Sequence, residues 1–210
     1  MRRRGYLTVK RAVDVLISSA VLTLSSPVVA VAAGAVRLTM GRPVLFVQTR
    51  PGLNGQPFRL VKLRTMLTPE QASGAVADDA RLTRIGALLR RTSIDELPTL
   101  WNVIRGDMSL VGPRPLLMSY LDRYSPEQFR RHEVRPGLTG LAQVAGRNAI
   151  SWDERLRLDV EYVDTASAWR DLQILVRTAG LVLSGRGVSA EGHSTMPEFC
   201  PTDSTEATAH

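Results

Sequence analysis

Cysteine and histidine are scarce in this sequence, and their scarcity excludes several classes of site. Cys200 is the only cysteine among 210 residues, which excludes a disulfide scaffold and a zinc site built from several thiolates. The three histidines, His132, His193 and His210, lie too far apart in the chain to suggest metal ligands. The phosphate loop GxxxxGK[ST], the dinucleotide fingerprint GxGxxG and the hydrolase elbow GxSxG are all absent, so these common folds are not indicated.

Acidic residues are scarce in the first third of the chain, and this narrows the class of partner. The formal net charge of +7 indicates an anionic partner such as nucleic acid, phospholipid or a phosphorylated substrate. Residues 1–69 contain eleven basic residues and one acid, whereas the rest of the chain has sixteen basic residues and nineteen acids. A domain that binds nucleic acid more often carries its positive charge throughout. The distribution therefore favours a membrane surface, and we expect no nucleic-acid partner.

One long uncharged run interrupts a composition that is otherwise typical of a globular protein, with 44% hydrophobic and 22% charged residues. Residues 15–36 carry no charge and would form a helix of ~33 Å, long enough to cross a bilayer. This run has three interpretations: a cleavable signal peptide, a helix that spans the membrane, and a helix that enters the membrane and returns on the same side. Ser26 and Pro27 in mid-run and basic residues on both flanks favour re-entry, because prolines break helices and basic flanks prefer the cytoplasm.

The remaining sequence predicts an α/β fold that is rich in helix and has short strands. Alternation of apolar residues predicts strands at residues 44–47 and 58–66, and we expect a further strand through residues 143–144. Amphipathic periodicity and capping signals predict the helices, which we place at residues 81–91, 99–105, 125–133, 151–163 and 171–183. Small and polar residues predict a mobile loop at 68–79 and a disordered end of the tail from residue 201.

The adjacent acids Asp95 and Glu96 have two interpretations. Ser93 and Glu96 fit the S-x-x-E capping box, in which the acids only stabilise the start of a helix. However, arginines at 90–91 come just before the pair, and Pro98 makes a simple helix start at Ser93 awkward. Acids among arginines also suit a phosphate-handling site, where Mg²⁺ needs hard oxygen ligands. In that case we expect the arginines and Mg²⁺ together to keep the pKa of the Asp95 carboxyl low.

Three further cations are candidates for binding phosphate. Lys62 and Arg64 alternate with apolar residues on a predicted strand, where a solvated strand face is the other interpretation. Arg114 lies between two prolines, so its guanidinium is held on a stiff turn and loses little entropy when it grips a phosphate.

Five motifs together resemble a known family. They are KLRTM at 62–66, RTSIDELP at 91–98, GDMSLVGPRP at 106–115, RPGLTG at 135–140 and GRNAISW at 146–152. In this order they are similar to the bacterial sugar transferases, the monotopic polyprenyl-phosphate phosphoglycosyl transferases. The short chain and the tail at 187–193 resemble minimal members of the bacillosamine-phosphate transferase type.

The resemblance implies a reaction and a location. Asp95 would attack the sugar-bearing phosphate of a UDP-sugar, release UMP and carry the phosphosugar, which polyprenyl phosphate then accepts in the first membrane step of glycoconjugate biosynthesis. Mg²⁺ would be held by Asp95 and Glu96. A helix broken at Ser26 and Pro27 would re-enter the bacterial inner membrane and leave the catalytic domain on the cytoplasmic side. The implied domains are the membrane hairpin at 1–43, the catalytic domain at 44–190 and a tail at 191–210.

The expected substrate- and phosphate-binding residues are Lys62, Arg64, Arg91, Arg114 and Arg147. The expected partners are a UDP-sugar, polyprenyl phosphate and the anionic lipid of the cytoplasmic leaflet, and a homodimer is compatible with them. The alternative is a non-catalytic, membrane-anchored basic protein that binds lipid or nucleic acid, in which case Asp95 would have no role in any activity.

Overall fold

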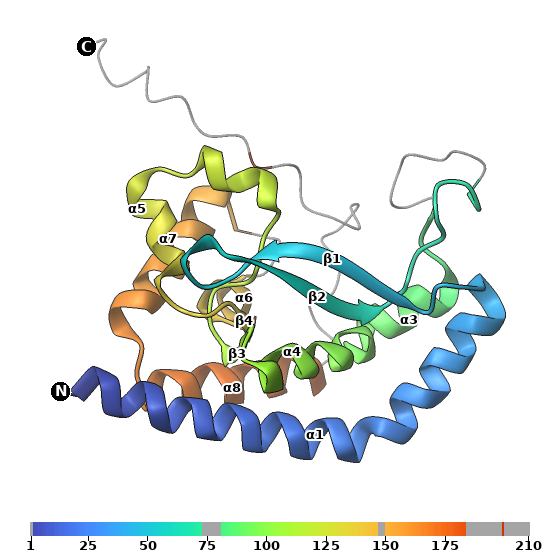
Figure 1. Ribbon diagram of the computed structural model, residues 1–210, viewed down its shortest axis with the longest axis horizontal. Helices are drawn as coiled ribbons and strands as arrows, with labels where there is room; N and C mark the ends of the chain where they lie inside the picture. The colour runs from blue at the N-terminus through green and yellow to red at the C-terminus, as the bar shows by residue number, and fades with distance from the viewer. Residues whose placement is uncertain (1, 73–80, 147–149, 184–198, 200–210) are drawn as a thin grey trace, which may run out of the picture.

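The computed structural model describes residues 2–72, 81–146, 150–183 and 199, and it shows a helix-rich α/β fold with short strands (Figure 1). Most of the predicted mobile loop, the predicted disordered tail and Arg147 lie outside the described residues. The elements are α1 (Arg2–Met40), β1 (Leu45–Pro51), η1 (Leu53–Gly55), β2 (Pro57–Leu63), α3 (Arg84–Arg91), η2 (Ile94–Thr99), α4 (Leu100–Arg105), β3 (Ser109–Val111), η3 (Met118–Arg123), α5 (Pro126–Phe129), η4 (Arg130–Glu133), β4 (Gly137–Thr139), α6 (Leu141–Ala145), α7 (Trp152–Thr165) and α8 (Ala168–Leu183).

Helix α1 is continuous but bent, and its only internal proline is Pro27 (Figure 1). Proline has no N–H, so Pro27 leaves the carbonyl of Thr23, four residues earlier, without its helical donor. The Ser26 hydroxyl donates to this same carbonyl at 2.8 Å. The Ser-Pro pair therefore bends the helix while keeping the freed carbonyl hydrogen-bonded, which is the condition for a break within a membrane. Residues Gly5–Met40 form the one described helix that is long and apolar enough to cross a membrane.

Both halves of α1 are fastened to the rest of the fold. In the first half, Asp14 is buried and accepts hydrogen bonds from the Ser109 hydroxyl at 2.7 Å and the Leu110 N–H at 3.1 Å. Arg11 donates to two carbonyls in the last turn of α4. In the second half, Val36 and Met40 are buried in a cluster with apolar residues of β2 and α3.

Two small sheets position the site. Strands β1 and β2 form an antiparallel hairpin, in which Phe46 lies opposite Lys62 and Arg50 opposite Phe58. Strands β3 and β4 pair in parallel, and Gly137 of β4 passes so close to Gly112 that an added Cβ would lie 2.1 Å from the Gly112 nitrogen. This close approach fixes the start of the turn that carries Arg114.

The main hydrophobic core lies between the hairpin, α4, β3, α6, α7 and α8, and its most buried members include Val103, Tyr162 and Ile174. The capping signals in the sequence correctly predicted two helix ends. Gly106 ends α4 with φ 94, and the Ser151 side chain accepts from the Glu154 N–H at the start of α7. The strand predicted through residues 143–144 is wrong, because these residues belong to the helix α6.

Candidate active site

The carboxylate pair lies on η2, a short 3-10 segment that follows Ser93. Ser93 has a left-handed backbone with φ 56, and its side chain makes no capping hydrogen bond. The capping-box interpretation of Ser93 and Glu96 is therefore wrong. The Glu96 side chain instead points toward cations from two other elements.

Glu96 is held by Lys62 of β2 and by Arg114. Its Oε1 accepts from the Lys62 Nζ at 2.6 Å and from an Arg114 Nη at 2.8 Å. Burial on its own would raise the pKa of Glu96, but the charges of Lys62 and Arg114 outweigh it and hold the pKa well below its usual range. Glu96 is therefore ionised, and it orients both cations.

Asp95 differs from its neighbour. It is buried, and within the part of the chain that the structure describes its carboxylate accepts no hydrogen bond. Burial and the adjacent charge of Glu96 raise the pKa of Asp95 to about 6, against the lowering effect of Lys62, Arg90 and Arg114. The arginines on their own therefore do not keep this pKa low, because burial and the charge of Glu96 outweigh them; the expectation for the site with Mg²⁺ stays a prediction. A carboxylate without partners is available to a phosphorus atom or a metal ion.

Backbone contacts bring Lys62 next to Glu96. On one side of Lys62, the Val61 N–H donates to the Asn102 side chain at 3.1 Å and the Val61 carbonyl accepts from the Thr99 hydroxyl at 2.8 Å. These bonds join β2 to η2 and α4. Burial lowers the pKa of Lys62, so an anion that approaches this ammonium stabilises its charged form.

A buried ion pair positions Arg114 from the other side. The Arg131 guanidinium donates to the Asp159 carboxylate at 2.6 Å and to the Arg114 carbonyl at 2.8 Å. The neighbouring prolines, Pro113 and Pro115, restrict the same turn. The backbone of Arg114 is thus fixed, while its side chain keeps about two fifths of its surface exposed.

The predicted cations do not all meet at the carboxylates. Lys62 and Arg114 do. Arg64 is buried elsewhere, where its guanidinium donates to the carbonyls of Met40 and Gly41 at the end of α1. Arg91 is exposed at the end of α3, and Arg147 lies outside the described residues.

Arg90, rather than the predicted Arg91, lies near the carboxylates. Its Nε donates to the Thr65 hydroxyl at 3.0 Å, and its charge lowers the pKa of Asp95. Gly86 allows α3 to come this close, because an added Cβ would lie 1.8 Å from the Thr65 carbonyl oxygen. The pairing of a helical arginine with the KLRTM threonine is a tertiary contact with no signal in the local sequence.

The two carboxylates suit a magnesium ion that is shared with a substrate. Mg²⁺ takes oxygen ligands and is usually held by one or two carboxylates together with phosphate and water. Both Asp95 oxygens and the second Glu96 oxygen make no hydrogen bond among the described residues. No group of three or more metal-binding side chains occurs in those residues. An ion held by this pair would take its other ligands from water or a bound phosphate.

An apolar cavity of about 410 Å³ lies between α1 and α3. It is formed by the second half of α1, by α3 and by Ile94, the residue before Asp95. Its lining residues are Pro27, Val28, Val31, Ala32, Ala35, Ile85, Leu88, Leu89 and Ile94. The bend of α1 at Pro27 therefore forms one wall of an apolar space, and the site is linked to this space through Ile94, which precedes Asp95 in the chain.

Comparison with known proteins gives consistent matches over most of the chain. Residues 5–185 match the family described as bacterial sugar transferase. A protein of Bacillus subtilis named as an uncharacterized sugar transferase is 48% identical over 92% of this chain and 96% of its own length. The UDP-glucose:undecaprenyl-phosphate glucose-1-phosphate transferase of Caulobacter vibrioides is 46% identical over 83% of this chain and 70% of its own length. An exopolysaccharide production protein of Rhizobium meliloti is 38% identical over 85% of this chain and 87% of its own length.

Proposed function

The chain belongs to the bacterial sugar transferase family, and on this premise we propose that it transfers a sugar 1-phosphate from a UDP-sugar to polyprenyl phosphate. The observation that carries the proposal is the contrast within one carboxylate pair. Glu96 is hydrogen-bonded to Lys62 and Arg114, whereas the Asp95 carboxylate accepts no hydrogen bond among the described residues. The named activity of the Caulobacter vibrioides relative supports undecaprenyl phosphate as the acceptor.

The reaction would proceed by two displacements at one phosphorus atom. In the first, an Asp95 oxygen bonds to the phosphorus that bears the sugar, and the bond from that phosphorus to UMP breaks. In the second, an oxygen of polyprenyl phosphate attacks the same phosphorus, and the bond to Asp95 breaks. The products are UMP, the polyprenyl diphosphate sugar and the regenerated carboxylate.

The residues around Asp95 have separate tasks in this scheme. Lys62 and Arg114 face the negative charge of the transferred phosphate, and Glu96 holds them in place before the substrate arrives. Asp95 and Glu96 would hold Mg²⁺, which neutralises phosphate charge when bound. The positive charge also favours the ionised form of Asp95, the form that attacks.

We propose that α1 enters the cytoplasmic leaflet and returns to the same side. Its first half is bonded to β3 and α4 and its second half packs on α3, so both halves contact one catalytic unit. A helix that crossed the membrane would place one half beyond that unit. Helix α8, which lies beside α1 in Figure 1, exposes Trp169, Leu172 and Val176, as suits a membrane surface.

The acceptor fits the apolar cavity between α1 and α3. Its isoprenoid chain would lie against Val31 and Leu88, and its phosphate would have to pass Ile94 to reach Asp95. The basic residues of the first 69 positions would attract the anionic lipid of the same leaflet. A homodimer stays a prediction.

The reaction is tested by incubating the purified protein in detergent with undecaprenyl phosphate and a panel of radiolabelled UDP-sugars. We expect one or a few sugars to give a labelled lipid product and an equal amount of UMP, with no lipid product when the acceptor is omitted. Absence of both products for every sugar would contradict the proposed function.

The topology is tested by labelling single cysteines in intact cells, with Cys200→Ser as the background. Gly5→Cys and Arg59→Cys stand before and after the apolar part of α1. Both cysteines should react with a thiol reagent that cannot cross the membrane only after the cells are made permeable. Reaction of one of them in intact cells would contradict re-entry.

A further inference from the structure

Arg50, at the far end of β1, is a cation that the site described above does not use. It is half-buried, and among the described residues it makes no ion pair with any acid. The register places Arg50 opposite Phe58, and Lys62 opposite Phe46, so Arg50 and Lys62 lie on the same face of the hairpin. Their positions differ by four residues along the strands, about 13 Å.

The Arg50 guanidinium is directed back along the strand toward the active site. One of its Nη atoms donates to the Gln48 Oε1 at 2.6 Å, and Gln48 lies two residues closer to the strand position of Lys62. Its Nε is buried and has no hydrogen-bond partner among the described residues. A buried N–H donor without an acceptor costs free energy, which a bound anion would recover.

A second guanidinium faces the same space. Burial first, and then the charge of Arg114, lower the pKa of Arg50 to about 10. The same Arg114 lies close enough to Asp95 to lower the pKa of that carboxyl. Arg114 is therefore within electrostatic reach of both Asp95 and Arg50, and its Nη bond to Glu96 leaves further donors for a ligand.

The charges at this place suit the diphosphate of a nucleotide sugar. Lys62, Arg114 and Arg50 supply three positive charges, and Glu96 offsets one of them. This set of cations complements the negative charge of the diphosphate of a nucleotide sugar. Arginine is well suited to the second phosphate, because its planar fork can bind two oxygens at once.

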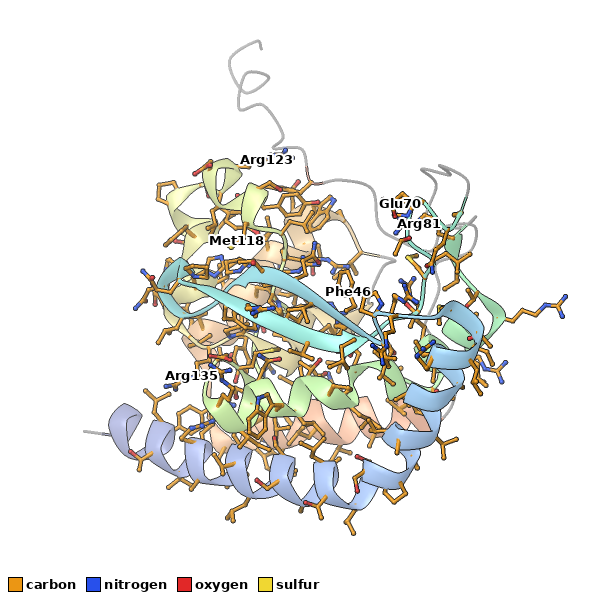
Figure 2. The ribbon with its side chains drawn as sticks, turned by 45° about the vertical axis from the view of Figure 1, so that its right-hand side comes forward. Phe46, Glu70, Arg81, Met118, Arg123 and Arg135 are labelled. Carbon is orange, nitrogen blue, oxygen red and sulfur yellow. The ribbon has the colours of Figure 1, made fainter. Side chains whose placement is uncertain are left out.

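The position of Arg50 decides which phosphate it meets. The apolar cavity lies where α1 meets α3, and β1 starts from this corner and runs away from it (Figure 1). Figure 2 shows Phe46 on the hairpin, with Met118 and Arg123 of η3 above the hairpin and Arg135 on its other side, nearer α1. Arg50, near the end of β1, therefore lies away from the corner of α1 and α3 that forms the apolar cavity.

We propose that Arg50, together with Arg114, binds the phosphate of the nucleotide that leaves as UMP. The inference rests on the proposed function, because it assumes a UDP-sugar whose other phosphate is attacked by Asp95. Arg50 would hold the departing phosphate on the side away from the carboxylate. It would also stabilise the charge that this phosphate gains when its bond to the transferred phosphorus breaks.

The test is the affinity of the full-length protein for UMP, measured by calorimetry in detergent. Arg50→Gln should weaken UMP binding at least tenfold, about 1.4 kcal/mol, and Arg50→Lys should restore only part of it because an ammonium lacks the fork. Arg59→Gln is the matched control: Arg59 is exposed on β2 of the same hairpin, on the opposite face. It removes the same charge and should leave UMP affinity within twofold.

Each outcome separates this inference from the proposed function. If the parent protein binds UMP and Arg50→Gln binds it equally well, with an unchanged melting temperature, the inference is overturned. If the parent binds neither UMP nor a UDP-sugar, the proposed function fails first. If Arg50→Gln raises the KM for polyprenyl phosphate and leaves UMP affinity unchanged, the site takes the lipid phosphate and the assignment to the nucleotide is overturned.

Discussion

Replacing Arg131 by methionine tests whether a buried ion pair positions the arginine of the phosphate site. The side chains of Arg131 and Asp159 are 1% and 3% exposed. Two nitrogens of the Arg131 guanidinium donate to one Asp159 oxygen at 2.6 and 3.1 Å, and one of them also donates to the Arg114 carbonyl at 2.8 Å. A single side chain thus joins α7 to the turn that carries Arg114.

The cost of this change follows from what it leaves behind. Without Arg131, the buried Asp159 carboxylate loses the cation that is hydrogen-bonded to it and keeps only the charge of Arg155 nearby. Breaking a buried ion pair in this way typically costs about 3–5 kcal/mol. For a chain of this size, each kcal/mol lowers the melting temperature by roughly 2–4 °C. We therefore expect Arg131→Met to melt on the order of 10 °C below the parent. Arg130→Met is the control, because Arg130 pairs only with exposed acids and should leave the melting temperature nearly unchanged.

The double variant Arg131→Met/Asp159→Leu separates stability from function. Removing both charges takes away the unpaired carboxylate, so most of the stability should return. The Arg114 carbonyl still lacks its donor, so kcat/KM for the UDP-sugar should stay at least about tenfold low. The assays are calorimetric melting and steady-state kinetics at saturating acceptor. Full recovery of both stability and kcat/KM would refute a positioning role for Arg131.

Three further predictions concern pH, the apolar cavity and the phosphate site. Burial lowers the pKa of His132 from 6.5 to about 4. As the pH falls from 6.5 to 4, the unfolded chain therefore takes up a proton before the folded chain does, and the free energy of unfolding decreases. Between pH 6.5 and 4, the free energy of unfolding of His132→Asn should fall by about 3 kcal/mol less than that of the parent protein, as measured by denaturant titration. An equal fall in both proteins would contradict this. Leu88→Trp should fill part of the cavity and raise the KM for undecaprenyl phosphate severalfold without changing UMP affinity; an unchanged KM places the lipid elsewhere. Arg114→Lys should lower kcat/KM about tenfold or more, and near-native kinetics would remove Arg114 from the site.

Features that depend on local sequence were predictable. Ser151 and Gly106 act as helix caps through contacts within a few residues, so their chemistry is visible in the sequence. The Ser26–Pro27 bend belongs to the same class, because the hydroxyl satisfies a carbonyl only three residues away.

Features that depend on docking were not predictable in the same way. Residues 143–144 are apolar or neutral enough for a strand, but Leu141 and Ala142 are buried in the core and continue as a helix after Gly140. Ser93 and Glu96 match the local pattern of a capping box. However, the Glu96 side chain is hydrogen-bonded to Lys62 and Arg114, which lie 34 and 18 residues away in the chain.

The phosphate-site arginines show the same limit. Two consecutive arginines on a helix point about 100° apart, and only the docking of α3 on Thr65 decides that Arg90 faces the site. Lys62 and Arg64 are two residues apart, a spacing that would put both side chains on one face of a strand, but β2 ends at Leu63 and Arg64 lies beyond it. Its guanidinium therefore reaches the end of α1.

The central claim is that Asp95 carries the phosphosugar, and intact-protein mass spectrometry tests it most directly. The parent protein is exposed briefly to its preferred UDP-sugar and Mg²⁺ without polyprenyl phosphate, and should gain the mass of one sugar phosphate on Asp95. Asp95→Asn keeps the shape of the side chain but cannot attack phosphorus, so it should fold, gain no mass and lose activity by several orders of magnitude. Glu96→Gln should also lose activity, but excess Mg²⁺ should recover part of it. An adduct that persists in Asp95→Asn, or that maps to another residue of the parent protein, would contradict the account.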